Sequence, residues 1–353
     1  MKLTIFVTVF ITLSSVLCED GWMVPQEDGT FKWMSVQTLR EYRKMFSQMP
    51  SQRKDYVKFY LYTPETGNNV QEITSSYNFN TSRDTRFIIH GWKNDYKSDI
   101  NKILRNAYLD KGLYNVIVVD WNEFAKKTYV SASYKVKDVG SQPWCSIAGL
   151  AARYVQKGYL FAVWGLDPAG PLFSYNEISW RISELDAKYV ECIHTNAGTL
   201  GFTEALGQAD YYMNGGQSQP GCGLDLTGSC SHSRSYEYFA ESIADNKFMS
   251  YSCTDYKSAM KNKCNKLQIN FHNMGYGFVD SSGYYYTPVN KKSPFGKDSS
   301  SKVFPPSQFN VRVDLEPYIS NGLAISRFRI EVEDPTAIKG KVNFVLLAHA
   351  NKW

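Results

Sequence analysis

The sequence predicts an α/β protein with a mostly parallel central sheet. Two short segments, residues 85–90 (TRFIIH) and 115–120 (NVIVVD), have the composition of strands, and the second is almost continuously apolar. Between them, residues 98–111 carry apolar side chains at helical spacing. A strand, a helix and a second strand in succession indicate a parallel β–α–β unit.

The pattern continues on both sides of this unit. Residues 55–64 alternate apolar and polar side chains and predict a strand, and residues 147–157 predict a helix rich in small residues. Two more strands are predicted at 159–166 and 188–194. A polar run at 298–302 is typical of a linker, and alternating segments follow it at 309–315, 328–332 and 342–346.

These observations divide the chain into three parts. Residues 1–18 form a secretory signal, with one basic residue, a short apolar run and predicted cleavage after Cys18. This run is shorter than the roughly 20 residues that span a bilayer, and no later segment could span one. Residues 19–298 form the α/β domain, and residues 299–353 form the linker and a small β-rich tail of unknown role.

Secretion agrees with the cysteines. Six remain after signal removal, and proximity in sequence suggests the pairs Cys222–Cys230 and Cys253–Cys264, although sequence alone does not decide connectivity. Asn80 opens a glycosylation sequon, Asn-Thr-Ser.

Charge and composition exclude several functions. The net charge is +5 and the lysines are spread along the chain, so the sequence does not indicate nucleic-acid binding. There is no cluster with metal-ligand spacing and no glycine-rich phosphate loop, so we expect no metal and no cofactor.

Five motifs carry a family resemblance. They are IIHGW from Ile88, VVDW from Val118, GLDPAGPLF ending at Phe173, IHTNAGTLGF from Ile193 and CSHSRSYEYFAESI from Cys230. Together these motifs make residues 22–297 resemble the pancreatic-type lipase family, especially its short secreted insect-like members and phospholipases A1. The resemblance implies the α/β-hydrolase fold and a lipid or a lipid–water interface as partner.

The resemblance also assigns roles. In such lipases a serine attacks the ester, a histidine transfers the proton and an aspartate orients the histidine. Asp167 and His232 occupy the last two positions, and the backbone N–H of Trp92 is the first oxyanion donor. His90 and His194 are expected to be hydrogen-bonded scaffold residues.

The serine of the family pattern is missing. The expected Gly-x-Ser-x-Gly elbow falls on residues 140–146 (GSQPWCS), with Gln142 in the serine position and Pro143, which has no N–H, after it. The helix and central strand that carry the elbow in the family are missing too. We therefore expect residues 161–166 to pair with 115–120 instead, leaving Asp167 and His232 face to face beside an empty position.

Codons for residues 141–146 can be chosen so that a shift of one base yields His-Ser-Leu-Gly-Ala, the family elbow. This favours a frame or splicing error in an ester hydrolase, inactive in this form, over natural loss. The alternative is a naturally non-catalytic binding or storage protein, like the yolk proteins that keep this fold without the serine. A third hypothesis, Cys145 as the nucleophile, is disfavoured because it lies outside the elbow.

Overall fold

The computed structural model describes residues 20–47, 57–69, 71–73, 78–140, 161–245, 247–264, 272–275, 281–297, 311–320 and 323–332. The chain divides into two compact units, Met1–Asp298 and Ser299–Trp353. Several predicted features lie outside the described residues: the signal segment, Gln142 with Pro143 and Cys145, the helix at 147–157, the linker at 298–302 and the tail strand at 342–346.

One sheet of the first unit has four strands. In spatial order they are β4 (Gln71–Glu72), β3 (Lys58–Tyr62), β6 (Asn115–Asp120) and β5 (Thr85–Ile89). β5 runs parallel to β6, with Ile88 opposite Val118, and β3 is antiparallel to β6. Every residue of β6 is buried, as its apolar sequence predicted.

Helix α2 (Asp99–Lys111) connects β5 to β6, where the sequence predicted it. Acidic Asp99 in the first turn and basic Lys111 in the last turn both interact favourably with the helix dipole. Leu104 and Tyr108 are buried in the main core, against the sheet. The apolar residues that occur at helical spacing in the sequence thus form the face of α2 that packs on the core.

A second sheet has six strands. In spatial order they are β11 (His272–Asn273), β10 (Met249–Cys253), β12 (Gly283–Thr287), β9 (Ala209–Met213), β8 (Tyr189–His194) and β7 (Ala162–Leu166). The pairs β7–β8, β8–β9 and β9–β12 are parallel. Their carboxyl ends therefore lie at one edge, where α/β sheets place functional groups.

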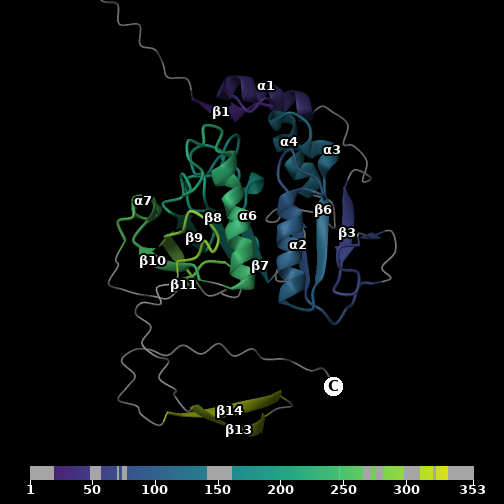
Figure 1. Cartoon of the computed structure of the whole chain (residues 1–353), viewed down its shortest axis with the longest axis vertical. Coiled ribbons are helices and arrows are strands. Elements are labelled where there is room, and N and C mark those ends of the chain that lie inside the picture. Colours follow the sequence, from purple (N-terminus) through teal and green to yellow (C-terminus); the bar gives the residue numbers. More distant parts are fainter. Residues whose placement is uncertain are drawn as a thin grey trace, which may run out of the picture. The chain divides into compact units, whose positions relative to one another are not determined.

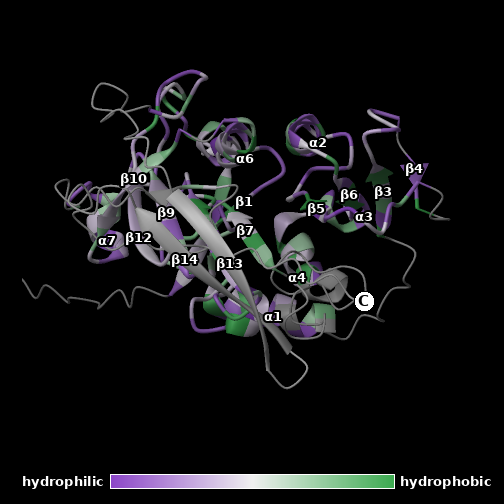
Figure 2. Ribbon diagram, turned by 90° about the horizontal axis from the view of Figure 1, so that it is seen from below, coloured by the Kyte–Doolittle hydropathy of each residue, from purple (hydrophilic) through white to green (hydrophobic). Residues whose placement is uncertain are grey.

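β5 ends the first sheet and β7 ends the second. The prediction that residues 161–166 pair with 115–120 is wrong, because β3 and β5 already occupy both sides of β6. The crossover through α2 places β5, rather than β6, at the edge of the first sheet. We call the place between β5 and β7, where the described strands of the two sheets do not pair, the break. Helices α2 and α6 (Ser229–Ala244) pack side by side, as the end-on view in Figure 2 shows.

The N-terminal elements are the hairpin β1 (Gly21–Pro25) and β2 (Phe31–Ser35) and helix α1 (Val36–Ser47). Two helices follow β6, α3 (Asn122–Ala125) and α4 (Tyr129–Gly140), and β1 and α1 contact α4 (Figure 1). Tyr129 in α4 donates a hydrogen bond to the carbonyl of Pro171, beyond β7, at 2.9 Å. This contact ties the two sheets together near the end of β7. The described residues also include two short elements, η2 (Ile178–Trp180) and α7 (Tyr256–Met260).

The second unit contains an antiparallel hairpin of β13 (Val311–Ser320) and β14 (Leu323–Val332). Both strands fall where alternation predicted β structure. Within the described residues, no helix has the length and apolar character needed to cross a membrane.

Candidate active site

Asp167 lies directly after β7, at the carboxyl end of the strand, and is buried. Its Oδ1 accepts hydrogen bonds from the backbone N–H groups of Thr195 and Asn196, at 2.8 and 2.9 Å. The backbone is left-handed, with φ of 49°, a region that aspartate tolerates better than most residues. The carboxylate is therefore held rigidly, with Oδ2 free for another partner.

His232 supplies that partner from the first turns of α6. Its Nδ1 lies 2.6 Å from Asp167 Oδ2, and its side chain is 40% exposed. Because a carboxylate only accepts hydrogen bonds, Nδ1 carries the proton. Nε2 is then left as the acceptor, the tautomer a general base requires.

Gly201 leaves room for this pair. A Cβ at this position would collide with the Asp167 carboxylate, so any larger residue would displace it. Gly201 belongs to a turn in which its N–H donates to Asn196 O at 3.0 Å. The sequence motif around residues 193–202 thus supplies the donors and the space that Asp167 needs.

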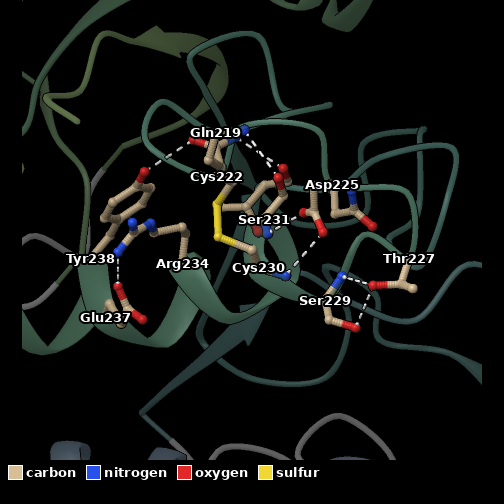
Figure 3. Close-up of a disulfide and its surroundings, with 12 residues drawn as sticks. Gln219, Cys222, Asp225, Thr227, Ser229, Cys230, Ser231, Arg234, Glu237 and Tyr238 are labelled. Atoms are coloured by element: carbon tan, nitrogen blue, oxygen red, sulfur yellow. Dashed lines mark hydrogen bonds and ion pairs between the residues drawn. A yellow bond between two sulfur atoms is a disulfide. The ribbon is translucent and has the colours of Figure 1, made fainter. Parts of the chain in front are cut away.

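A short disulfide loop sets the start of α6. Cys222 and Cys230 are bonded, and the Asp225 carboxylate accepts from the backbone N–H groups of Cys230 and Ser231, at 3.3 and 2.7 Å (Figure 3). A carboxylate at the N-terminus of a helix accepts hydrogen bonds from backbone N–H groups that have no partner within the helix. Its negative charge also interacts favourably with the positive end of the helix dipole. The loop therefore fixes the first turn of α6, which carries His232 toward Asp167.

The other two histidines that we predicted to be scaffold residues are buried and paired. His90 Nε2 lies 2.9 Å from Asp120 Oδ1, and His194 Nε2 lies 2.8 Å from Asp210 Oδ1. Burial alone would raise the pKa of Asp120, but hydrogen bonds from His90 and Asn122 outweigh it and lower that pKa. Both pairs hold loops at strand ends, and neither ring is accessible.

Trp92 lies after β5, on the other side of the break. It packs against the same apolar cluster as Leu172, which belongs to the loop after Asp167. Its indole N–H donates to Lys127 O at 2.7 Å, whereas no described residue accepts from its backbone N–H. That backbone donor is the one assigned to the oxyanion, but no described contact joins Trp92 to His232. Gln142, the expected nucleophile position, lies outside the described residues.

The remaining predicted residues have plain positions. Cys253–Cys264 is the second disulfide, so both predicted pairs are present. Asn80 is exposed. Cys192 is unpaired and buried in β8, and burial raises the pKa of its thiol. Within the described residues, the donor atoms of Cys222, Asp225 and Cys230 lie close enough to suggest a metal site, but disulfide formation and helix capping already occupy them.

Sequence reasoning missed the residues that hold Asp167 in place. Thr195 and Asn196 act through backbone N–H groups, which no side-chain pattern marks. Gly201 was part of a quoted motif, but its role depends on contact with Asp167, 34 positions away along the chain. Asp225 could have been found, because an acidic residue shortly before a helix is a known start signal.

A buried aspartate at the carboxyl end of a parallel strand, paired with a half-exposed histidine from the start of α6, is typical of α/β hydrolases. The family model described as Lipase matches residues 27–144 and 140–295, and the chain belongs to that family. Phospholipase A1 of Vespa crabro is 31% identical, over 67% of this chain and 90% of its own length. Phospholipase A1 VesT1.02 of Vespa tropica is 30% identical, over 69% and 92%. Pancreatic triacylglycerol lipase of Oryctolagus cuniculus is 31% identical, over 62% of this chain but only 59% of the lipase.

Proposed function

We propose that this chain is a secreted lipid-ester hydrolase from whose sequence the nucleophile segment has been lost, so that it is inactive in this form. The observation that carries the proposal is the intact pair of Asp167 and His232, in which Nδ1 lies 2.6 Å from Oδ2 and no described residue pairs with Nε2. A protein that had long ceased to catalyse would have no need of this geometry. The second candidate, a non-catalytic storage protein, leaves it unexplained.

The burial of the strands supports the proposal that a strand is missing between β5 and β7. Parallel strands are usually buried on both faces, and β6, β8 and β9 are buried at every residue. β5 and β7, at the break, are only partly buried. Phe87 in β5 is 50% exposed, and the buried indole N–H of Trp164 in β7 has no partner among the described residues. One more strand between β5 and β7 would cover both edges.

The chain has too little length at the break to supply that strand. Helix α4 continues to Gly140, and the predicted helix at 147–157 leaves only residues 141–146 for a strand and its two connections. The family model also matches in two segments that meet at residues 140–144. Both observations support a break within those residues, for which codons can be chosen so that a shift of one base gives His-Ser-Leu-Gly-Ala.

The proposed chemistry follows from the residues that remain. A serine at the restored elbow would give its proton to His232 Nε2 and attack the ester carbonyl, while Asp167 stabilises the imidazolium. The backbone N–H of Trp92 and that of the residue after the serine would bind the oxyanion. His232 would then protonate the leaving alcohol, and water would release the acyl group.

Among lipid esters, we favour a phospholipid as the substrate, as in the phospholipase A1 branch of the family. The disulfide between Cys222 and Cys230 encloses only seven residues, too few for an amphipathic helix that would cover the site. The proposal also includes secretion through the segment 1–18 and glycosylation at exposed Asn80.

The test begins with the transcript across residues 134–150. We expect an additional segment of about 30–40 residues, the length of one helix and one strand with connections, ending in Gly-His-Ser-Leu-Gly. The restored protein should hydrolyse phospholipid at the first acyl position, whereas the present chain should not hydrolyse even a short-chain phenyl ester. A transcript that matches the present chain, or ester hydrolysis by it that Asp167→Ala abolishes, would overturn the proposal.

A further inference from the structure

His194 is the last residue of β8 and is fully buried. Its Nδ1 lies 3.0 Å from the carbonyl oxygen of Phe202, and its Nε2 lies 2.8 Å from Oδ1 of Asp210. A carbonyl and a carboxylate only accept hydrogen bonds, whereas a neutral imidazole has one donor nitrogen and one acceptor nitrogen. Both contacts are hydrogen bonds only if each ring nitrogen carries a proton, which makes the ring an imidazolium.

The surroundings of Asp210 agree with a charged pair. Its Oδ1 also accepts from the backbone N–H of Leu206 at 2.8 Å, and its Oδ2 accepts from that of Gly207 at 3.0 Å. Three donors around two oxygens favour the ionised form of the carboxyl group. The Asp210 side chain is only 1% exposed, and a buried carboxylate without a positive partner is costly. The positive charge of His194 offsets that cost.

The ring of Tyr212 also favours a cation at this position. It lies parallel to the ring of His194, with the two centroids 4.3 Å apart and the planes 4° from parallel. The face of an aromatic ring attracts a positive charge, and this attraction is stronger away from water. His194 therefore has a carboxylate at its edge and a π-face against its plane.

The two buried histidines differ in what their contacts require. His90 also lies near a carbonyl and a carboxylate, those of Gly91 and Asp120, at 3.0 and 2.9 Å. However, the backbone N–H of Trp121 points at its Nε2 from 3.3 Å, and a donor there needs an unprotonated nitrogen. No described residue donates to either ring nitrogen of His194. The contacts of His194 therefore require a second proton, and those of His90 do not.

The hydrogen bond from His194 to Phe202 closes the loop that holds Asp167. Residues 195–201 supply the two backbone N–H groups that donate to Asp167 Oδ1, and the glycine that leaves room for its carboxylate. The backbone N–H of Phe202 in turn donates to the carbonyl of Pro168, at 2.7 Å, one residue after Asp167. The ring of His194 is thus connected to Asp167 along the loop and also through Phe202.

A neutral ring at position 194 would break this arrangement. One of its nitrogens would present a lone pair to a buried acceptor, either Phe202 O or Asp210 Oδ1, and neither acceptor would gain another donor. Loss of the bond to Phe202 would leave the loop at 195–201 without this closure. Because that loop positions Oδ1 of Asp167, its displacement would also move Oδ2 away from His232.

We propose that His194 is a buried imidazolium that positions Asp167 for its hydrogen bond to His232. No described contact joins His194 to His232, so His194 is a positioning residue that acts through the loop at 195–201. Its importance for catalysis rests on the proposed function. The hydrogen bond that it supports, however, is present in the chain as it exists and can be measured without a nucleophile.

The first test needs no substitution. The chain has five histidines, so labelling histidine with nitrogen-15 gives few signals in an NMR spectrum. At neutral pH we expect both ring nitrogens of His194 to have the chemical shift of a protonated nitrogen, and each to show coupling to a directly bonded proton. A ring nitrogen of His194 without a proton would overturn the proposal.

The second test measures the effect on His232. The proton on its Nδ1, which Asp167 accepts at 2.6 Å, should exchange slowly with solvent in the parent. His194→Gln keeps an N–H group for Asp210 but loses the donor to Phe202, so this exchange should become at least about tenfold faster. His194→Asn places its N–H where Nδ1 was, so exchange should be slower than in His194→Gln.

His90→Gln is the matched control. His90 is also buried and also pairs with an aspartate, but it is not part of the loop that holds Asp167. This variant should lower the melting temperature, as His194→Gln does, and keep the parent's exchange rate at His232. Equal exchange in the parent and His194→Gln, or equally fast exchange in both glutamine variants, would show that His194 has no positioning role.

The two tests remain decisive under other outcomes. The measurement on the unmodified chain decides the charge of His194 even where a variant is too unstable to measure. A negative result in either test would leave the proposed hydrolase function standing, because hydrolysis of a soluble ester by the restored protein tests that function separately.

Discussion

Glu191 offers a quantitative test of the packing around the site. It lies in the middle of β8 and is fully buried; its carboxylate accepts from Tyr189 Oη and from the backbone N–H of Gly275, each at 2.7 Å. Burial is the dominant effect and raises the pKa of Glu191 from 4.5 to about 8, against those two hydrogen bonds. Folding at neutral pH therefore requires this side chain to keep a proton that the unfolded chain has lost.

The sign follows from proton linkage. Between pH 4.5 and about 8 the folded protein binds the extra proton, so this group makes stability fall as pH rises and adds no further change above pH 8. One pKa unit corresponds to about 1.4 kcal/mol, so the cost is roughly 3 kcal/mol at pH 7 and roughly 5 kcal/mol above pH 8.

Glu191→Gln should remove this cost, because glutamine has the shape of the protonated side chain and no charge. We expect urea unfolding to show the parent and the variant equally stable near pH 4.5, and the variant more stable by about 3–5 kcal/mol at pH 8.5. Exposed Glu184→Gln is the matched control and should change little at either pH. A Glu191→Gln effect that is the same at every pH would refute the reasoning.

Three further predictions concern the candidate site. In the protein with the elbow restored, Asp167→Asn should keep the fold but lower kcat by about 10⁴-fold, because an amide favours the wrong histidine tautomer; a kcat within tenfold of the parent would contradict the assigned role. Gly201→Ala should destabilise the fold by about 1–3 kcal/mol in urea unfolding, because its methyl group displaces the Asp167 carboxylate. Gly91→Ala, where nothing lies within 4 Å of the added carbon, is the control, and equal losses in the two variants would argue against it. Replacing both cysteines, Cys222→Ser with Cys230→Ser, should lower the free energy of unfolding by about 2–3 kcal/mol, because the unfolded chain is no longer closed into a loop. This difference between the parent and the variant should disappear when both are unfolded in a reducing buffer.

The sequence determined the elements whose signal is local. Helix α2 and strands β3, β5, β6 and β8 follow from apolar spacing that marks a face or a buried strand. The motifs around Asp167 and His232 indicated the pair, and the short separations of the cysteines suggested both disulfides. In each case the informative residues lie within a few positions of one another.

The tertiary structure decided what depends on contacts between distant segments. Which strand borders the break could not be obtained from the sequence, because strand order depends on crossovers, and these put β5 rather than β6 there. The sequence placed Asp167 and His232 in one site, but their separation of 2.6 Å depends on backbone donors at 195 and 196 and on the space at Gly201. Backbone groups carry no residue-type signal, so only the folded chain reveals how they hold a carboxylate.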